Sequence, residues 1–419
     1  MIDLVKTLHA EFQMRLSDID QQWVTRLVNL PEEHGKATVT IGMRRSGKTF
    51  ALLQKIKKLL DSQVPISRIL YIDFEDDRLQ PMDQKGLSEL LDNFYSLFPE
   101  NHEQTCYLFL DEIHTVEKWP LVIRRLLNTK KAKIYLSGSS AKMLSTEIAT
   151  SLRGRAIAVE VWPYSFYEYL SAKGQKKPEK TLSRSESDQF NKLLCQFLEE
   201  GGFPEIANKP KVTQTRILQD YVSVVTYRDI VERHKIENIA LLNYMISYLI
   251  KNAGTPCSAN KMYNTFKSQG FNIGRTTVYE FLSHIEDAFL SFTVPLFSES
   301  VRQMQNNPKK LYSIDFGLSN AHQLSLYTNF GRLFENLIYL DLRRRGDEIY
   351  YYLTKERYEV DFLTKSLDGV MHLYQVCWDM DDPETKFREE RALKAAELEL
   401  NIRGEFITAK TYFDWLFKG

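Results

Sequence analysis

The sequence predicts an α/β fold built around a mostly parallel sheet. Short apolar runs alternate with segments of helical periodicity, and the strand-like runs are Ala37–Ile41, Ile69–Phe74, Tyr107–Leu110 and Ile134–Leu136. Strands separated by helices usually pair in parallel, and those helices cover the faces of the sheet. With 419 residues, of which 43% are hydrophobic, the chain is expected to form more than one domain.

The composition excludes several classes of protein. Lys+Arg and Asp+Glu both number 55, so any contact with DNA requires a local basic patch. The four cysteines form no CxxC pair, which argues against a disulfide framework and a zinc cluster. The amino terminus lacks the basic and apolar segments of a signal peptide, and no apolar run approaches the length of a membrane span. We therefore expect a cytoplasmic protein without membrane insertion.

The pattern along the chain predicts five parts. These are N-terminal helices over 1–35, a parallel-sheet core over 36–170, a helical lid over 171–238, a winged-helix domain over 239–322 and an α/β domain over 323–419. The winged helix is predicted from a helix, a turn, a helix from Arg275 to His284 and two β-like runs. For the last part we expect helix, three strands, helix and strand, at Phe334–Arg345, Glu348–Leu353, Glu359–Leu363, His372–Val376, Lys386–Leu400 and Glu405–Thr408.

A glycine-containing loop follows the first strand and opens a helix at Gly42-Met43-Arg44-Arg45-Ser46-Gly47-Lys48-Thr49. Its glycines let backbone N–H groups turn inward around phosphates, and the helix N-terminus adds a favourable dipole. Lys48 is expected to reach the β- and γ-phosphates, and the Thr49 hydroxyl to ligate Mg²⁺. The expected cofactor contacts are Gly42, Arg44, Arg45, Ser46, Gly47, Lys48, Thr49 and Phe50.

A second motif lies about sixty residues downstream, where an apolar strand ends in Asp111 and Glu112. Buried strands rarely end in paired acids, and a nucleotide site formed with the upstream loop would explain this pair. Asp111 is expected to hold Mg²⁺ through its water shell, and Glu112 to polarise the attacking water as general base.

Two further segments predict contacts to the γ-phosphate or, for the first of them, to the attacking water. The strand at Ile134–Leu136 ends in small polar residues, of which Ser137 is our first choice and Ser139 our second, with ordinary turn chemistry as the alternative. Arg153 and Arg155 follow, and either is a candidate arginine finger on the phosphate of a neighbouring chain. A finger of this kind requires a homo-oligomer or a conformational closure, and a plain surface arginine is the alternative.

Taken together, these motifs resemble a group of prokaryotic AAA+ ATPases, the predominantly archaeal-type group. The resemblance extends over nearly the whole chain, because it also includes Gly201-Gly202-Phe203-Pro204, Gly331-Arg332-Leu333-Phe334-Glu335-Asn336, Tyr358-Glu359-Val360-Asp361-Phe362 and Tyr374-Gln375-Val376-Cys377. It implies an AAA+ P-loop core that binds and hydrolyses ATP with Mg²⁺, a helical lid, a winged helix and a C-terminal domain similar to PD-(D/E)xK nucleases. ATP, in place of GTP, follows from this resemblance.

The nuclease-like end departs from an active pattern. Glu335 and Asp361 match the helix acid and the strand-end acid that hold Mg²⁺ in such enzymes. At the third position Gln375 and Cys377 replace the acid and the lysine, and Cys377 cannot stand in for an ammonium group. We therefore expect an inactive scaffold, unless Lys365 or Lys386 has migrated into the site.

Two hypotheses for the function remain. The first is an ATP-driven enzyme or switch acting on DNA, with the helix that begins at Arg275 as a candidate recognition helix. The second is a nucleotide-dependent switch that binds a protein partner without DNA, which the balanced charge favours. A small-molecule kinase is the weakest alternative, because no acceptor-binding motif stands out.

Overall fold

The computed structural model describes residues 1–19, 24–138, 152–176, 183–322 and 328–418. Its chain divides into two compact units, Met1–Tyr164 and Ser165–Gly419. The finer division into five parts stays a prediction. No helix within the described ranges is long and apolar enough to cross a membrane.

The first unit is built on a parallel sheet, as predicted. Its strands lie in the order β2-β3-β4-β1-β5, and each neighbouring pair is parallel. The strands are β1 (Ala37–Ile41), β2 (Ile69–Asp73), β3 (Cys106–Asp111), β4 (Ala132–Gly138) and β5 (Ala156–Glu160). This is the strand order of the AAA+ P-loop fold. Strand β5 was not predicted from the sequence, although its first four residues are apolar.

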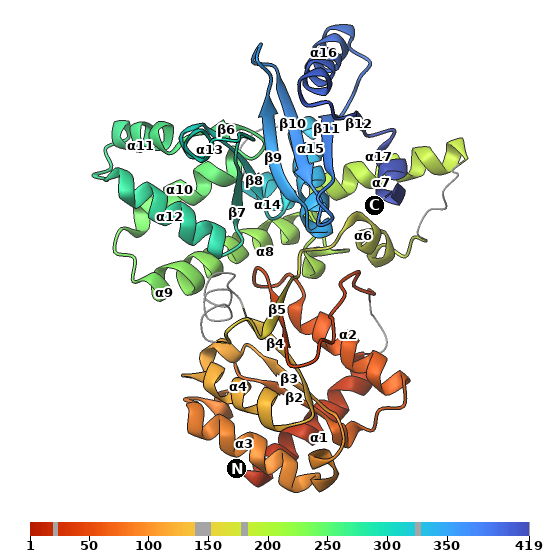
Figure 1. Cartoon of the computed structure of the whole chain (residues 1–419), viewed down its shortest axis with the longest axis vertical. Coiled ribbons are helices and arrows are strands. Elements are labelled where there is room, and N and C mark those ends of the chain that lie inside the picture. The colour runs from red at the N-terminus through yellow and green to blue at the C-terminus, as the bar shows by residue number, and fades with distance from the viewer. Residues whose placement is uncertain (20–23, 139–151, 177–182, 323–327, 419) are drawn as a thin grey trace. The chain divides into compact units, whose positions relative to one another are not determined.

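Helices cover both faces of this sheet (Figure 1). They are α1 (Ile2–Ile19), α2 (Lys48–Asp61), α3 (Gln84–Leu97) and α4 (Trp119–Thr129), with short 3₁₀ turns at Ile66–Arg68, Asp77–Leu79, Pro99–His102 and Ile113–Thr115. Residues of α1 and α2 share one core with the sheet, where Phe12 stacks on Tyr71 at 5.0 Å. On the other face, the Tyr95 hydroxyl of α3 lies 2.9 Å from Cys106 Sγ.

The amino-terminal segment differs from the prediction of several helices over 1–35. It holds one described helix, α1, and residues 24–36 are not helical. Helix α1 contributes Phe12 to the core that it shares with the sheet, and it lies within the first compact unit.

The second unit begins with helices and contains two sheets. The helices up to the first sheet are α6 (Phe166–Ala172), α7 (Arg184–Glu200), α8 (Lys211–Val224), a π-helix (Val225–Val231), α9 (Glu232–His234) and α10 (Ile239–Lys251), with a 3₁₀ turn at Pro204–Ile206. The elements that follow are β6 (Pro256–Cys257), α11 (Ala259–Ser268), α12 (Arg275–Asp287), β7 (Ser291–Val294), α13 (Val301–Asn306), β8 (Lys309–Ser313) and α14 (Phe316–His322). Strands β6, β8 and β7 form an antiparallel sheet in that order.

The second sheet of this unit follows the predicted order of elements closely. Its elements are α15 (Phe330–Arg345), β9 (Glu348–Leu353), β10 (Glu359–Lys365), β11 (Met371–Cys377), α16 (Pro383–Leu400), β12 (Gly404–Thr408) and α17 (Tyr412–Lys418). Strands β9, β10 and β11 are antiparallel neighbours, and β12 joins β11 in parallel. The bounds of β9 agree with the prediction.

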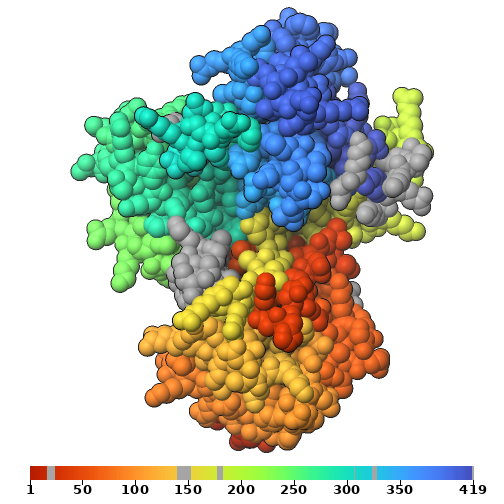
Figure 2. Space-filling model, viewed as in Figure 1, coloured from red at the N-terminus to blue at the C-terminus, as the bar shows by residue number. Residues whose placement is uncertain are grey.

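The two sheets of the second unit lie against each other. Leu296 bridges Tyr351, and the Phe297 N–H donates to the Tyr351 carbonyl at 2.8 Å. In the space-filling view the segment around residue 300 lies next to the C-terminal part of the chain, which is drawn in blue (Figure 2). A residue of β8 can therefore reach the side chains of the C-terminal sheet.

The turn at Gly201-Gly202-Phe203-Pro204 has a packing role in the second unit. A Cβ added to Gly201 would lie 2.3 Å from Asp315 Oδ1, so only glycine fits there, and its φ of +95° also favours glycine. The Asp315 carboxylate accepts the N–H groups of Gly202 at 2.6 Å and Gly317 at 2.8 Å. Through these hydrogen bonds, the buried carboxylate holds the turn after α7 against the connection between β8 and α14. Burial raises its pKa to about 7, although those N–H donors act in the opposite direction.

Candidate functional site

The loop between β1 and α2 has the conformation that its glycines were expected to allow. Gly42 has φ +151°, and a Cβ there would lie 2.3 Å from the Val161 carbonyl oxygen. Gly47 caps α2 in the left-handed region with φ 101°, and Arg45 also has positive φ. The Ser46 hydroxyl is buried and has no hydrogen-bond partner among the described residues. A buried hydroxyl that lacks a partner, beside the first turn of a helix, suits an anionic ligand.

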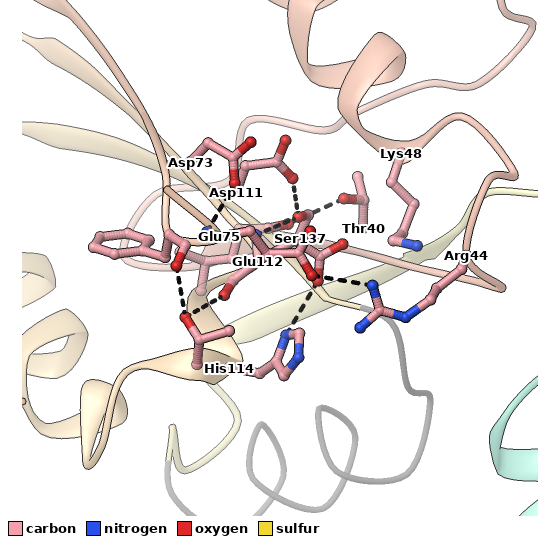
Figure 3. Close-up of polar contacts among 12 residues, drawn as sticks. Thr40, Arg44, Lys48, Asp73, Glu75, Asp111, Glu112, His114 and Ser137 are labelled. Carbon is pink, nitrogen blue, oxygen red and sulfur yellow. Dashed lines mark hydrogen bonds and ion pairs between the residues drawn. The ribbon is translucent and has the colours of Figure 1, made fainter. Parts of the chain in front are cut away.

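Lys48 is buried at the start of α2, and its ammonium group faces the loop. Its Nζ donates to the carbonyl oxygens of Gly42 at 3.0 Å and Met43 at 3.1 Å. An ammonium group has three N–H donors, so one remains for a phosphate oxygen. Figure 3 shows Lys48 and Arg44 beside the acids at the carboxyl edge of the sheet.

Asp111 ends β3 and is the most buried acid of this site. Its carboxylate accepts hydrogen bonds from the Ser137 hydroxyl and, at 2.8 Å, from the Tyr71 hydroxyl. Burial raises the pKa of Asp111, the Ser137 hydrogen bond opposes this, and the Glu112 charge adds to the rise. The Thr49 side chain lies close enough to lower the pKa of Asp111, so the two expected Mg²⁺ ligands are neighbours.

Glu112 follows with a left-handed backbone, φ 51°. Its Oε2 lies 3.2 Å from His114 Nδ1. Burial alone would raise the Glu112 pKa, but the contact with His114 and the Lys48 charge outweigh it and lower the pKa to about 2. Glu112 is therefore ionised at neutral pH, as a general base must be.

Ser137 connects the two acids. Besides donating to Asp111, its hydroxyl accepts the Glu112 N–H at 2.8 Å. The side chain is fully buried at the end of β4. Both of its contacts orient Asp111 and Glu112, so the expected contact to the γ-phosphate stays a prediction. Ser139 lies outside the described residues.

The structure does not bring Arg153 and Arg155 to this loop. Arg155 precedes β5, and the Ala37 N–H at the start of β1 donates to its carbonyl. Because β1 and β5 are parallel, both arginines lie at the amino edge of the sheet, whereas the loop leaves the carboxyl edge. There they line a depression of about 390 Å³ with Leu121, Arg124, Arg125 and Asn128.

The other predicted contact residues differ in exposure. Arg44 donates to Glu75 at 3.0 Å, and Arg45 is exposed on the loop. Phe50 lies on α2 with half of its surface exposed.

Sequence reasoning missed three side chains of this site. Arg26 is buried and donates to the carbonyl oxygens of Ser46 at 2.9 Å and Trp162 at 2.6 Å, which braces the loop against the end of β5. Asp73 ends β2 directly beside Asp111, and burial raises its pKa. Asp73 could have been predicted as a site residue, because it lies at the end of an apolar run, as Asp111 does. Arg26 and His114 carry no such signal.

The C-terminal acids meet at a second place. Glu335 of α15 and Asp361 of β10 both contact the Lys310 ammonium, at 2.7 and 2.8 Å. Gln375 does not join them through its amide nitrogen, which donates to Glu389 at 2.5 Å, and its amide oxygen accepts the Asp361 N–H at 3.3 Å. Lys365 is exposed and Lys386 pairs with Glu390, so the predicted substitutes for the missing lysine are wrong.

Comparison with known proteins yields two family matches. Residues 34–170 match a family described as an AAA domain, and residues 191–328 match a domain of unknown function, DUF8612. Among solved structures, the Walker-type ATPase PABY2304 of Pyrococcus abyssi is similar with 14% identity and a TM-score of 0.43, over 68% of this chain and 90% of that one.

Two proteins of other organisms are similar over most of the chain. An uncharacterized protein of Haemophilus influenzae is 27% identical over 89% of this chain and 89% of its own length. The uncharacterized protein MJ1544 of Methanocaldococcus jannaschii is 37% identical over 90% of this chain and 82% of its own length. The chain therefore belongs to the family of AAA-domain proteins that includes MJ1544.

Proposed function

We propose that this protein binds ATP with Mg²⁺ at the loop between β1 and α2 and hydrolyses it. The observation that carries the proposal is the meeting of Lys48, Asp111 and an ionised Glu112 at the carboxyl edge of a parallel sheet. This edge is where ligands bind in open α/β sheets. The buried Ser46 hydroxyl and the Gly42 backbone fit a phosphate group.

Each residue has a role that follows from its contacts. The third N–H of Lys48 and the loop N–H groups would bind the β- and γ-phosphates. Thr49 and Asp111 would hold Mg²⁺, which neutralises phosphate charge when it is bound and which commonly uses one or two protein carboxylates. Glu112 would accept the proton of the attacking water, and Ser137 would position both acids through the contacts described above.

Arg153 and Arg155 fit a role on a second chain. Strands of the sheet have five to seven residues, so its amino edge lies roughly 17–23 Å from its carboxyl edge. Neither arginine can then reach the phosphates of its own chain through this unit. We propose that one of them acts on the nucleotide of a neighbouring copy in a homo-oligomer.

DNA is the proposed target of the nucleotide-driven change. The order α10, β6, α11, α12, β7 and β8, with an antiparallel sheet, supports a winged helix. On α12 the side chains of Arg275, Thr276 and Tyr279 are exposed. Arg275 and Lys267 of α11 both lie over the Tyr263 ring, so two cations gather at one place. Phosphate contacts from such a patch depend steeply on salt.

A protein partner is the alternative, and exposed apolar side chains favour it. On α16 the side chains of Phe387 and Leu398 are 66% and 79% exposed, and Leu367 in the turn between β10 and β11 is 89% exposed. Exposed apolar side chains form a protein interaction site where they lie in one contiguous patch. In this case ATP would set a conformation, and the C-terminal domain would bind the partner.

The C-terminal domain is proposed to be nuclease-like in fold and inactive. The order helix, antiparallel three-stranded meander, helix and parallel fourth strand supports the resemblance. The loss of an acid and a lysine at Gln375 and Cys377 supports inactivity.

ATP turnover by the full chain tests the proposal, with and without duplex and branched DNA at low salt. Lys48→Ala and Glu112→Gln are the test variants, and Lys58→Ala is the matched control because Lys58 is an exposed lysine on the same helix. We expect both test variants to lose turnover and the control to keep it. Stimulation by DNA that disappears as salt rises supports the DNA target. Turnover that DNA does not change favours the protein partner, and turnover that survives in Glu112→Gln contradicts the site.

A further inference from the structure

A buried lysine lies at the centre of the C-terminal acids. Lys310 comes from β8, and its Nζ lies 2.7 Å from Glu335 Oε1, 2.8 Å from Asp361 Oδ1 and 3.0 Å from Glu359 Oε1. The side chain is 2% exposed. A charged lysine is rarely buried this deeply unless opposite charges surround it. Here three carboxylates from α15 and β10 do so.

The number of donors matches the number of acceptors. A lysine ammonium has three N–H groups and no acceptor, and three carboxylate oxygens lie within hydrogen-bonding distance of Nζ. No N–H therefore remains to orient a water molecule or to contact a phosphate. Lys310 therefore differs from a catalytic lysine of a nuclease, which needs a free N–H for water or phosphate.

The carboxylates are held in place from their other sides. The Tyr312 hydroxyl donates to Glu335 at 2.8 Å, and the Val376 N–H donates to the second oxygen of Asp361 at 2.9 Å. Tyr312 is fully buried in β8, two residues after Lys310. Both β8 side chains thus fix acids that belong to the C-terminal sheet and its first helix.

A divalent cation does not fit this arrangement. Its ligands would be the same three carboxylate oxygens that already contact the ammonium group. Gln375, the remaining candidate ligand, hydrogen-bonds to the Asp361 backbone and to Glu389. Across the described parts of the chain, no group of three or more His, Cys, Asp or Glu side chains is arranged to hold a metal ion.

We propose that the Lys310 ammonium is the resident cation of the cluster Glu335, Glu359 and Asp361, so that the C-terminal domain takes no metal ion and cuts no nucleic acid. The ammonium group lies among these acids where a nuclease would hold Mg²⁺, and its single positive charge offsets part of their negative charge. It also ties the β6-β8-β7 sheet to the C-terminal sheet. This deepens the proposed inactivity of the nuclease-like domain by naming its cause, and it is independent of ATP hydrolysis in the first unit.

The test is Mn²⁺ binding by the nucleotide-free full chain, measured from the loss of the free-ion signal in electron paramagnetic resonance. The variants are Lys310→Ala, Lys310→Ala with Asp361→Asn, and Asp361→Asn alone. Lys365→Ala is the matched control, because this exposed lysine lies on the same strand as Asp361. Any Mn²⁺ bound in the first unit is common to all variants and cancels in the comparison.

We expect Lys310→Ala to bind one more Mn²⁺ per chain than the natural protein, and the added Asp361→Asn change to remove that ion. Asp361→Asn alone and Lys365→Ala should leave binding unchanged. A folded Lys310→Ala protein without the extra ion overturns the proposal. So does a natural protein that loses a bound Mn²⁺ when Asp361→Asn is introduced.

Two further measurements keep the proposal testable if Lys310→Ala does not fold. Glu335→Gln keeps Lys310 and removes one acid, and its Mn²⁺ binding should equal that of the natural protein. DNA cleavage with Mn²⁺ should be absent in both proteins, and cleavage that depends on Glu335 would contradict the proposal. ATP turnover of Glu335→Gln should be normal, so failure here and failure of the proposed ATPase are distinguishable.

Discussion

Two clusters of acidic side chains in this chain each contain a lysine, and they differ in which groups the lysine ammonium contacts. In the first unit, Lys48 gives two N–H groups to backbone carbonyls of its own loop, and Asp111 and Glu112 stand beside it. In the second unit, Lys310 lies within 3.0 Å of three carboxylates. The first arrangement leaves one N–H of Lys48 for a ligand, whereas in the second all three N–H groups of Lys310 face carboxylates of the protein. Residue types alone therefore do not identify a cation site.

The largest effect should come from the cluster of Lys48, Asp111 and Glu112, which we call the open cluster because Lys48 keeps one N–H for a ligand. Glu112→Gln removes the general base but keeps the shape of the side chain, so turnover should fall by roughly 10²- to 10⁴-fold. Binding of a fluorescent ATP analogue should persist in this variant. If turnover remained within a few fold of the natural value, the open cluster would not be the hydrolytic site.

We call Lys310 and its three carboxylates the closed cluster. Removal of its lysine should affect the stability of the protein instead of ATP turnover. Lys310→Met leaves three buried or half-buried carboxylates without their cation, which costs about 3–5 kcal/mol. The measurement is urea denaturation, and the loss should shrink at low pH because protonation relieves the repulsion. Lys365→Ala should stay within about 0.5 kcal/mol of the natural protein. Equal stability of Lys310→Met at pH 8 would contradict the closed cluster.

Asp315 provides the third comparison, because this buried carboxylate is held by backbone N–H groups of Gly202 and Gly317. Its pKa is raised from 3.8 to about 7, so the folded protein binds a proton more tightly than the unfolded chain. Stability from this group is therefore present at low pH and falls as the pH rises through about 7. Between pH 5.5 and 7.5 the free energy of unfolding of the second unit should drop by about 1–2 kcal/mol.

The control for this pH effect is Asp315→Asn, which cannot titrate. Glu335 also has a pKa raised to about 7 by burial, so part of the pH dependence should remain in that variant. A variant with the full natural slope would show that Asp315 does not titrate in this range.

The smallest effect should come from His114. Loss of its contact removes one cause of the low Glu112 pKa, so that pKa should rise from about 2. Turnover at pH 8 should change only a few fold, and the acid limb of the pH profile should move to higher pH. His102→Ala, a histidine on the 3₁₀ turn Pro99–His102, is the control. An acid limb that does not move would exclude His114 as a positioning residue for Glu112.

The open cluster was largely predictable and the closed one was not. The loop at 42–49 and the acids at 111–112 are short, continuous patterns, and the local chain geometry that they need is set by glycines and strand ends. Lys310 carries no such pattern, because its partners Glu335 and Asp361 lie 25 and 51 residues away along the chain. Only the packing of β8 on the C-terminal sheet brings them together. The same holds for Arg26, which reaches Trp162 across the first unit.

The number of Mn²⁺ ions bound per chain in the presence of a non-hydrolysable ATP analogue distinguishes most sharply between the two acid clusters. We predict one tightly bound ion, which disappears with Asp111→Asn and without the nucleotide, and which Asp361→Asn leaves in place. Two ions per chain, or a single ion lost through Asp361→Asn, would contradict this prediction.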